Sequence, residues 1–409
     1  MNDAVNDAVN GAVNDAVDDD PERWAWADVD LGAIEHNVAL LRRAVEPSDV
    51  WAVVKANGYG HGAVEVARSA LAAGAAGLCV ALVREGVELR AAGIDAPVLV
   101  LSEQPPTASD VIVRHGLTPT VYTAPAIDAL AAAADRAGVA DVAVHLKVDT
   151  GMQRVGANPH DVIGLVERLA DRTPALRLAG NFTHLAVADE PGRSGTADQL
   201  DRFDDVLVAL RRRDLLAPDV AVHAANSAAA LAHPSARRSF VRAGIAVYGI
   251  SPGAGVDESC VGLRPALSLR ARVSFVKTVL AGSKISYGWR HTFERDTTVA
   301  TVPIGYADGV PRRLSATGGE VLIGGRRRPI VGVVTMDQLM VDCGPGDPVR
   351  PGDEVVLIGG QDGPDGGRRI RAEEWADRLD TIGYEIVCGI GGRVPRHAGR
   401  NIDGGMVEH

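Results

Sequence analysis

Between Val50 and Ile245, short apolar runs alternate with helix-length amphipathic segments such as AVEVARSALAAG and DVIGLVERLADR. Strands separated by helices indicate a parallel sheet with crossover connections. The pattern contains eight such units, which is the number that closes a (β/α)8 barrel, and we therefore predict this fold. The alternative, an open doubly wound sheet, is less favoured because no GxGxxG follows the first strand. The eight runs lie at 50–55, 76–81, 97–102, 118–123, 142–149, 178–184, 220–226 and 240–245.

The pattern changes after about Arg264. Strand-like segments such as TTVATV, EVLIGG and DEVVLIGG follow one another, with turns rich in Gly, Asp and Pro, and one helix is expected over 372–379. This is typical of a mainly β module. The alternating segment around Trp24–Leu31 is a candidate to pair with it. We therefore expect an α/β fold with a barrel over 23–262 and a β domain over 263–409.

Residues 1–22 are expected to form a disordered acidic tail. Positions 1–20 repeat NDAV with a period of four and end in three aspartates. Asn and Asp favour turns over helix interiors, and the stretch has almost nothing to bury. It also lacks the basic and apolar regions of a secretory signal. An inert extension explains it better than a binding segment.

Composition and charge narrow the class of protein. The chain has 409 residues with 46% hydrophobic and 23% charged residues, an ordinary globular composition, and it has no apolar stretch long enough to span a membrane. The net charge of −11 argues against nucleic acid or an anionic membrane as the main partner. The four cysteines form no CxxC pair, so we expect a reduced, cytoplasmic protein without a structural metal.

Lysine is scarce in this chain. Only four of the 42 basic residues are lysines, namely Lys55, Lys147, Lys277 and Lys284. Each is therefore a candidate for the chemistry of a primary amine, such as Schiff-base or carbamate formation. Lys55 ends the first barrel strand in VVKANGYGHG, and a lysine at the end of a buried strand needs a partner or a covalent bond.

Other polar residues follow later strands of the predicted barrel. Arg154 follows the fifth strand, His184 ends the sixth, Ser227 opens the helix after the seventh, and Arg242 lies in the eighth. A single Ser or His at such a place is more often a helix cap or a core residue than a ligand. Five polar strand ends converging on one rim, however, indicate a site.

The loops after the last two strands of such a barrel are the usual phosphate site. Ser227, Gly244 and Ile245 suit that role. A lysine, a phosphate site and nearby arginines together describe a site for pyridoxal 5′-phosphate (PLP).

The chain closely resembles the alanine racemases, PLP-dependent racemases of fold type III, from about Trp24 to Arg396. The resemblance implies racemisation of L- and D-alanine, with PLP as cofactor and D-alanine supplied for peptidoglycan. It rests on nine motifs in the family's order: AVVKANGYGHG, KVDTGMQRVG, THLAVADE, HAANSAAAL, VRAGIAVYGISP, ISYGWRHTF, TVPIGYADGVPR, GVVTMDQLMVD and DTIGYEIVCGIGGRVPR.

The resemblance also implies roles for individual residues. Lys55 would carry PLP and act as one base, and Tyr287 would be the opposite base. Arg242 would face the pyridine nitrogen, with His184 hydrogen-bonded behind it. The phosphate would be bound by Tyr59, Tyr384, Ser227, Gly244 and Ile245.

Further implied roles concern the substrate and the assembly. Arg154 would contact the phenolic oxygen of PLP and the substrate carboxylate, the Met336 backbone N–H would bind that carboxylate, and Tyr306 would line the entrance. A head-to-tail homodimer would place Tyr287 of one subunit opposite Lys55 of the other. The chain departs from the family's usual residues at Gln153 and Thr335.

Lys147 is a candidate for carbamylation. It lies near the end of the fifth strand, on the rim that carries Arg154. Repulsion between the two cations, together with burial, would favour the neutral amine, which can take up carbon dioxide. The resemblance implies a carbamate paired with Arg154. A plain lysine paired with a nearby carboxylate is an equally weighted alternative.

Three other functions remain open from the sequence. A serine or broad-specificity racemase is the closest of these alternatives, because the sequence does not define the size of the substrate pocket. A decarboxylase with the same architecture would be expected to place an acidic residue where Arg242 stands. A non-catalytic PLP carrier would leave the β domain and Tyr287 unexplained.

Overall fold

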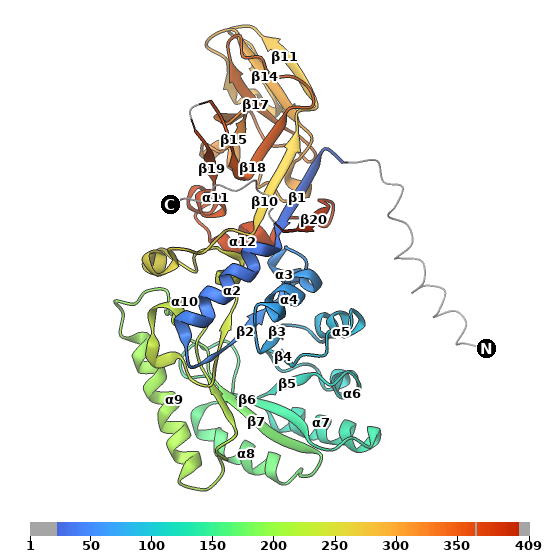
Figure 1. Cartoon of the computed structure of the whole chain (residues 1–409), viewed down its shortest axis with the longest axis vertical. Helices are drawn as coiled ribbons and strands as arrows, with labels where there is room; N and C mark the ends of the chain where they lie inside the picture. Colours follow the sequence, from blue (N-terminus) through green and yellow to red (C-terminus); the bar gives the residue numbers. More distant parts are fainter. Residues whose placement is uncertain (1–22, 365, 401–409) are drawn as a thin grey trace, which may run out of the picture.

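The computed structural model describes residues 23–364 and 366–400, which form an α/β barrel and an elongated β domain (Figure 1). The expected tail over 1–22 lies outside the described residues. Among the described residues, no helix is long and apolar enough to cross a membrane.

The barrel contains the eight strands that the apolar runs predicted, and each strand is parallel to its ladder neighbours. Hydrogen bonds from Ser239 N to Val222 O (2.8 Å) and from Arg242 N to Ala225 O (3.0 Å) join its two ends and complete the ring. The predicted fold class is therefore confirmed. The strands are β2 (Asp49–Val53), β3 (Gly77–Val80), β4 (Val98–Val100), β5 (Thr118–Val121), β6 (Val142–Lys147), β7 (Leu176–Phe182), β8 (Ala221–His223) and β9 (Phe240–Ala243).

Helices cover the outside of the ring, which is why strands such as β3 and β4 are buried along their whole length. Helix α2 (Leu31–Val45) precedes the first barrel strand and packs between α4 and α10. Asp30 caps it by accepting a hydrogen bond from Ala33 N (3.1 Å). The other helices are α3 (Lys55–Tyr59), α4 (Ala63–Ala72), α5 (Val83–Ala91), α6 (Ser109–Arg114), α7 (Ala124–Ala137), α8 (Val162–Ala170), α9 (Gly195–Arg211) and α10 (Ser227–Ala232).

The β domain is a ten-stranded sheet with the strand order β11-β14-β17-β16-β15-β18-β10-β1-β20 and β19 paired to β18. A separate short hairpin joins β12 to β13. The strands are β1 (Ala25–Asp30), β10 (Leu267–Arg272), β11 (Phe275–Val279), β12 (Lys284–Ile285), β13 (His291–Thr292), β14 (Thr297–Val302), β15 (Glu320–Ile323), β16 (Arg326–Val331), β17 (Leu339–Gly344), β18 (Glu354–Gln361), β19 (Arg368–Ile370) and β20 (Arg396–Gly399).

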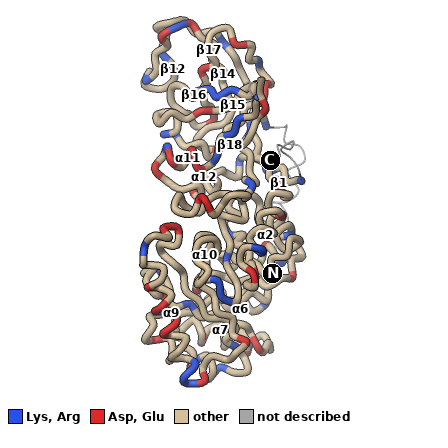
Figure 2. Tube along the Cα trace, turned by 60° about the vertical axis from the view of Figure 1, so that its left-hand side comes forward, with Lys and Arg blue, Asp and Glu red and all other residues tan. Residues whose placement is uncertain are grey.

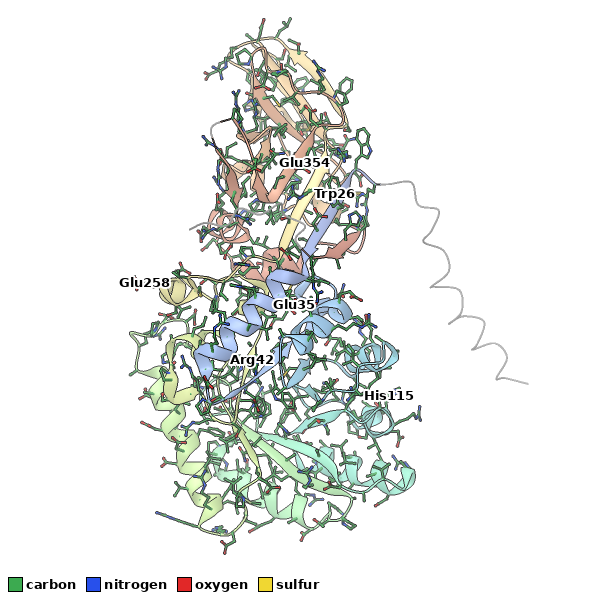
Figure 3. The ribbon with its side chains drawn as sticks, viewed as in Figure 1. Trp26, Glu35, Arg42, His115, Glu258 and Glu354 are labelled. Atoms are coloured by element: carbon green, nitrogen blue, oxygen red, sulfur yellow. The ribbon has the colours of Figure 1, made fainter. Side chains whose placement is uncertain are left out.

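Strand β1 pairs antiparallel with β10 and parallel with β20, which confirms the expected pairing of the Trp24–Leu31 segment. It therefore belongs to the second sheet, although it lies in the range 23–262 expected for the barrel. Figure 3 shows Trp26 on this strand, with Glu354 of β18 above it in this view and Glu35 and Arg42 along α2 below. The chain thus crosses from one domain to the other between Asp30 and Leu31.

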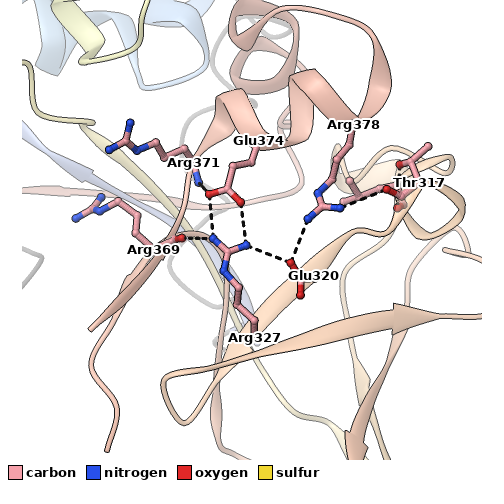
Figure 4. Close-up of polar contacts among 8 residues, drawn as sticks. Thr317, Glu320, Arg327, Arg369, Arg371, Glu374 and Arg378 are labelled. Carbon is pink, nitrogen blue, oxygen red and sulfur yellow. Dashed lines mark hydrogen bonds and ion pairs between the residues drawn. The ribbon is translucent and has the colours of Figure 1, made fainter. Parts of the chain in front are cut away.

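Two α-helices interrupt the described part of the β domain, where one was expected. The predicted helix is α11 (Ala372–Leu379), and the second is α12 (Gly383–Cys388). Arg327 pairs with Glu374 (2.8 Å) and Glu320 (3.2 Å), and Arg378 pairs with Glu320 (3.1 Å), so this network holds α11 on β15 and β16 (Figure 4). Helix α12 packs between α11 and α3, and it therefore brings the β domain to the barrel end that carries Lys55.

Candidate active site

Lys55 lies two residues after the end of β2 and begins a turn of unusual geometry. Ala56, Asn57 and Tyr59 have φ angles of 52°, 52° and 51°, in the left-handed region that favours glycine. The Lys55 side chain is half-buried. Its pKa is lowered from the ordinary value, first by burial and then by the positive charge of Arg154, while Glu85 acts in the opposite direction.

Tyr59, the last residue of this turn, lies next to two other tyrosines. The Tyr59 ring is buried, 4.9 Å from the ring of Tyr248 and 6.0 Å from that of Tyr384, measured between centroids. Burial raises the pKa of the Tyr59 and Tyr384 phenols, so both stay protonated and can donate hydrogen bonds. A Cβ at Gly244 would come within 2.6 Å of the Tyr59 hydroxyl, which explains why glycine is needed there.

Backbone N–H groups surround the Ser227 hydroxyl beside Tyr59. Ser227 Oγ accepts hydrogen bonds from Gly244 N (2.8 Å) and Ala246 N (3.4 Å), and Ile245 begins the next helical turn. A hydroxyl, two nearby backbone N–H groups and a neighbouring phenol form a suitable cradle for an oxyanion such as a phosphate.

Arg242 is a buried cation held by neutral groups. Its Nη2 donates to Thr183 O (2.9 Å) and Ala224 O (2.9 Å) and lies 3.3 Å from His184 Nδ1. Its Nη1 lies 2.6 Å from His223 Nδ1. Among the described residues it has no carboxylate partner and Nε forms no hydrogen bond, so this donor remains for a ligand.

Two histidines behind Arg242 were not identified from the sequence. Because Arg242 can only donate, His223 Nδ1 must accept, and the opposite nitrogen then donates to His145 Nδ1 at 3.0 Å. His223 stacks between the rings of Phe182 and Phe240. Burial and the charge of Arg242 lower the pKa of both histidines, which keeps them neutral. The sequence offers one signal for them: each histidine lies in a barrel strand whose other residues are mostly apolar.

Lys147, the last residue of β6, is buried and only 5% exposed. Burial and then the charges of Arg242 and Arg154 lower the pKa of its amine to about 8. Among the described residues it has no ion pair, so the expected alternative, pairing with a carboxylate, is not formed. The nearby Asp149 accepts hydrogen bonds from the backbone of Gly151 (2.9 Å) and Arg154 (3.2 Å), and it thereby shapes the loop that carries Arg154.

The other candidate residues lie on the β domain and are exposed. Tyr287 is 73% exposed, Met336 52% and Tyr306 43%. Hydrogen bonds of 3.0 Å from Tyr306 N to Thr335 O and from Ala307 N to Met336 O join two of their loops. Tyr287 follows β12, and Figure 2 shows β12 in the part of the β domain away from the barrel. It lines a cavity of about 640 Å³ whose lining comes from the β domain alone: Lys277, Ile285, Ser286, Tyr287, Gly288, Trp289, Thr301, Thr335, Gln338 and Met340.

The structure thus separates the candidates into two groups. Tyr287, Tyr306 and Met336 form the exposed group on the β domain. The other group lies at the C-terminal ends of the barrel strands, linked by contacts and electrostatic interactions, and comprises Lys55, Tyr59, Lys147, Arg154, His184, Ser227, Arg242, Gly244, Ile245 and Tyr384.

Known proteins are similar to this chain in both sequence and fold. Residues 29–252 match the family described as alanine racemase, N-terminal domain, and residues 266–398 match alanine racemase, C-terminal domain. The alanine racemase of Symbiobacterium thermophilum is 49% identical over 380 residues, which cover 93% of this chain and 98% of that protein.

Two solved structures extend the comparison. The alanine racemase of Bacillus anthracis with bound L-Ala-P has a TM-score of 0.86 at 39% identity, over 95% of this chain and 98% of that chain. The alanine racemase of Bartonella henselae with covalently bound pyridoxal phosphate has a TM-score of 0.81 at 29% identity, over 92% of this chain and all of that chain. With both domains matched in sequence and in fold, this chain belongs to the alanine racemase family.

Proposed function

We propose that this chain interconverts L- and D-alanine with PLP bound to Lys55, and that it supplies D-alanine for peptidoglycan. The observation that carries the proposal is the convergence of three features at one end of the barrel. These are the Lys55 amine with its lowered pKa, the donor cradle at Ser227, and the buried Arg242 without a carboxylate partner in the described chain. The relatives named above support both the substrate and the cofactor.

The residues present fit PLP. Gly244, Ile245, Ser227 and the two tyrosines would hold its phosphate, and Arg242 would hold its ring nitrogen through the remaining donor. Burial lowers the pKa of Arg242 to about 10, which still leaves it charged at neutral pH. Because it keeps its proton, it can donate a hydrogen bond without protonating the ring. We expect this to disfavour transamination and decarboxylation.

When bound, PLP supplies a conjugated ring that takes up the electron pair left on Cα after proton removal. Racemisation removes a proton from one face of Cα and returns one to the opposite face, so two proton-transfer groups must lie on opposite sides. Lys55 would serve one face and Tyr287 the other. Arg154 and the Met336 N–H would bind the substrate carboxylate, and Tyr306 would line the entrance.

The exposed position of Tyr287 supports a head-to-tail homodimer with shared sites. The cavity beside Tyr287 has no lining residue from the barrel of its own chain. A two-fold dimer would place two such surfaces on two barrel ends and form two equivalent sites. Large exposed apolar side chains of the β domain support burial against a partner, namely Phe275, Leu280, Tyr287, Trp289 and Met336.

Borohydride reduction of the PLP-loaded protein tests the assignment. We expect the cofactor to be fixed to the peptide that contains Lys55, and polarimetry to show interconversion of the alanine enantiomers that depends on PLP. Fixation to Lys147, Lys277 or Lys284 would contradict the assignment. Serine turnover at a similar rate would indicate a broad-specificity racemase. Release of carbon dioxide would indicate a decarboxylase, and PLP binding without turnover would indicate a non-catalytic carrier.

We also propose that Lys147 is carbamylated. Its burial, its lowered pKa and the absence of an ion pair in the described chain all favour a neutral amine that reacts with carbon dioxide and releases a proton. The resulting carbamate would pair with Arg154. Native mass spectrometry in saturating bicarbonate should show an added mass of one carbon dioxide that is absent from Lys147→Arg. An unmodified amine under these conditions would contradict the proposal.

A further inference from the structure

The left-handed turn after Lys55 needs an explanation for its stability. Non-glycine residues rarely adopt this backbone conformation, and they keep it only where surrounding contacts impose it. Here Ala56 and Asn57 adopt it in succession, both with φ 52° and ψ 50°, immediately after the residue proposed to carry the cofactor. Contacts to this turn therefore affect the position of the Lys55 backbone, from which the side chain extends.

The far end of the turn is held by the β domain. Gly60 O accepts a hydrogen bond from Arg396 Nε (3.1 Å), and a Cβ at Gly60 would come within 2.3 Å of Val387 O in α12. Within the turn, Asn57 Oδ1 accepts from Ala63 N (3.0 Å), where α4 begins. These contacts leave the first peptide of the turn, next to Lys55, to be held from elsewhere.

Glu85 holds that first peptide. It lies in the first turn of α5, and its Oε2 accepts from Ala81 N (2.8 Å) and Leu82 N (3.0 Å), as expected for a residue that caps its own helix. Its Oε1 accepts from Ala56 N at 2.7 Å. This second contact reaches 29 residues back along the chain and is not required for capping. Hydrogen bonds to an ionised carboxylate are about twice as strong as neutral ones.

We propose that Glu85 is a positioning residue for Lys55: its carboxylate fixes the left-handed turn and thereby directs the lysine side chain into the site. The inference rests on the proposed role of Lys55. The charge of Glu85 also favours the protonated amine, against the effects of burial and of Arg154. One side chain would therefore fix the location of the reacting group and also raise its proton affinity.

Glu103 provides a matched control. It is also half-buried in the barrel and accepts hydrogen bonds from Tyr122 N (2.7 Å) and Thr123 N (2.9 Å) at the start of α7. Its partners, however, lie after β5 rather than beside Lys55. Glu85→Gln and Glu103→Gln therefore remove comparable carboxylates from two neighbouring strand ends, and only the first contacts the turn.

The test measures amide hydrogen exchange over residues 55–60 of the full-length chain, with and without PLP. In Glu85→Gln, exchange there should rise about 10-fold or more, as expected for the loss of one charge-assisted hydrogen bond. Glu103→Gln should match the wild type. In the cofactor-free chain, competitive acylation of Lys55, read by peptide mass, should have its pH midpoint at lower pH in Glu85→Gln, because the stabilising negative charge is gone. Alanine turnover (kcat) should fall about 100-fold if the amine is displaced by about 1 Å.

Unchanged exchange and an unchanged acylation profile in Glu85→Gln would overturn the inference and leave Glu85 as a helix cap only. An equal change in Glu103→Gln would also overturn it, because the effect would then be general loosening. Failure of the proposed function is separate, since borohydride would then fail to fix PLP to Lys55 in the wild type. The exchange and acylation measurements do not depend on that result.

Discussion

The two groups of candidate residues, at the barrel end and on the β domain, differ in how fully they are buried and held within a single chain. At the barrel end, Arg242 and Ser227 are buried and hydrogen-bonded, and Lys55 begins a turn that neighbouring elements hold. On the β domain, Tyr287 and Met336 are exposed on loops. The first group is organised before any partner arrives, whereas the second presents surface that another molecule must cover. A site assembled from both would therefore depend on association as well as on folding.

Removal of Lys55 should have the largest effect on activity. Lys55→Ala removes both the covalent anchor and one base, so racemisation should fall by at least about 10⁴-fold. Lys55→Arg is the matched control that retains the charge, and it should be as inactive because a guanidinium replaces the primary amine. Polarimetry on both variants checks this. Substantial activity in Lys55→Arg would show that the position needs only a cation.

Two tryptophans test whether the exposed group is an interface. Trp375 is buried in α11, and Trp375→Ala should lower the free energy of unfolding by about 3–5 kcal/mol. Trp289 is 69% exposed, and Trp289→Ala should change that free energy by no more than about 0.5 kcal/mol. If Trp289 is an interface anchor, the same variant should weaken dimerisation by about 2 kcal/mol, roughly 30-fold in Kd.

Denaturant unfolding and analytical ultracentrifugation measure the two quantities. A Trp289→Ala variant that dimerises as tightly as the wild type would remove the tryptophan from the proposed interface. One that unfolds as easily as Trp375→Ala would show that Trp289 supports the fold of its own chain.

The barrel should also be the more acid-sensitive region. Burial lowers the pKa of His61 to about 4, while the unfolded chain takes up the same proton near pH 6.5. The unfolded state therefore binds more protons below pH 6.5, and the free energy of unfolding falls as the pH drops towards 4. One such group contributes about 1.4 kcal/mol per pH unit. His145, with its pKa lowered to about 3, acts in the same direction.

His61→Asn keeps a donor for the Tyr59 carbonyl but removes this titration, so it should reduce the slope of stability against pH by about one proton. The matched control is His397→Asn, on the exposed surface of β20. Urea unfolding at pH 7.0, 6.0 and 5.0 gives the slopes. Equal slopes in both variants and the wild type would show that folding does not lower the pKa of His61.

Much of the barrel was predictable because its signal is local. Each apolar run is buried by the strands and helices next to it in the sequence, so β2 to β9 lie where the runs do. The polar residues that follow these strands meet at one end of the barrel. The ring itself imposes that convergence, since the strands are parallel. Lys55, Ser227 and Arg242 could be found from their positions at strand ends.

The features that were missed depend on distant contacts or lack a distinct pattern. Helix α12 has only six residues, too few to show a helical period, and it is held by packing against α3 and α11. His145 and His223 lie in apolar strands, where sequence does not distinguish a histidine beside Arg242 from an ordinary core residue. The contact from Glu85 to Ala56 N joins the start of α5 to the turn after β2, and these segments are adjacent because β2 and β3 pair in the sheet.

Complementation between two inactive variants tests most directly the central claim that each site combines Lys55 of one chain with Tyr287 of another. Homodimers of Lys55→Ala and of Tyr287→Phe should each be nearly inactive, because every site lacks one base. A heterodimer would contain one site with both substitutions and one with neither. Unfolding and refolding the mixed variants should then restore a clear fraction of wild-type racemisation. Background activity in samples with proven heterodimers would contradict shared sites and place both bases in the same chain.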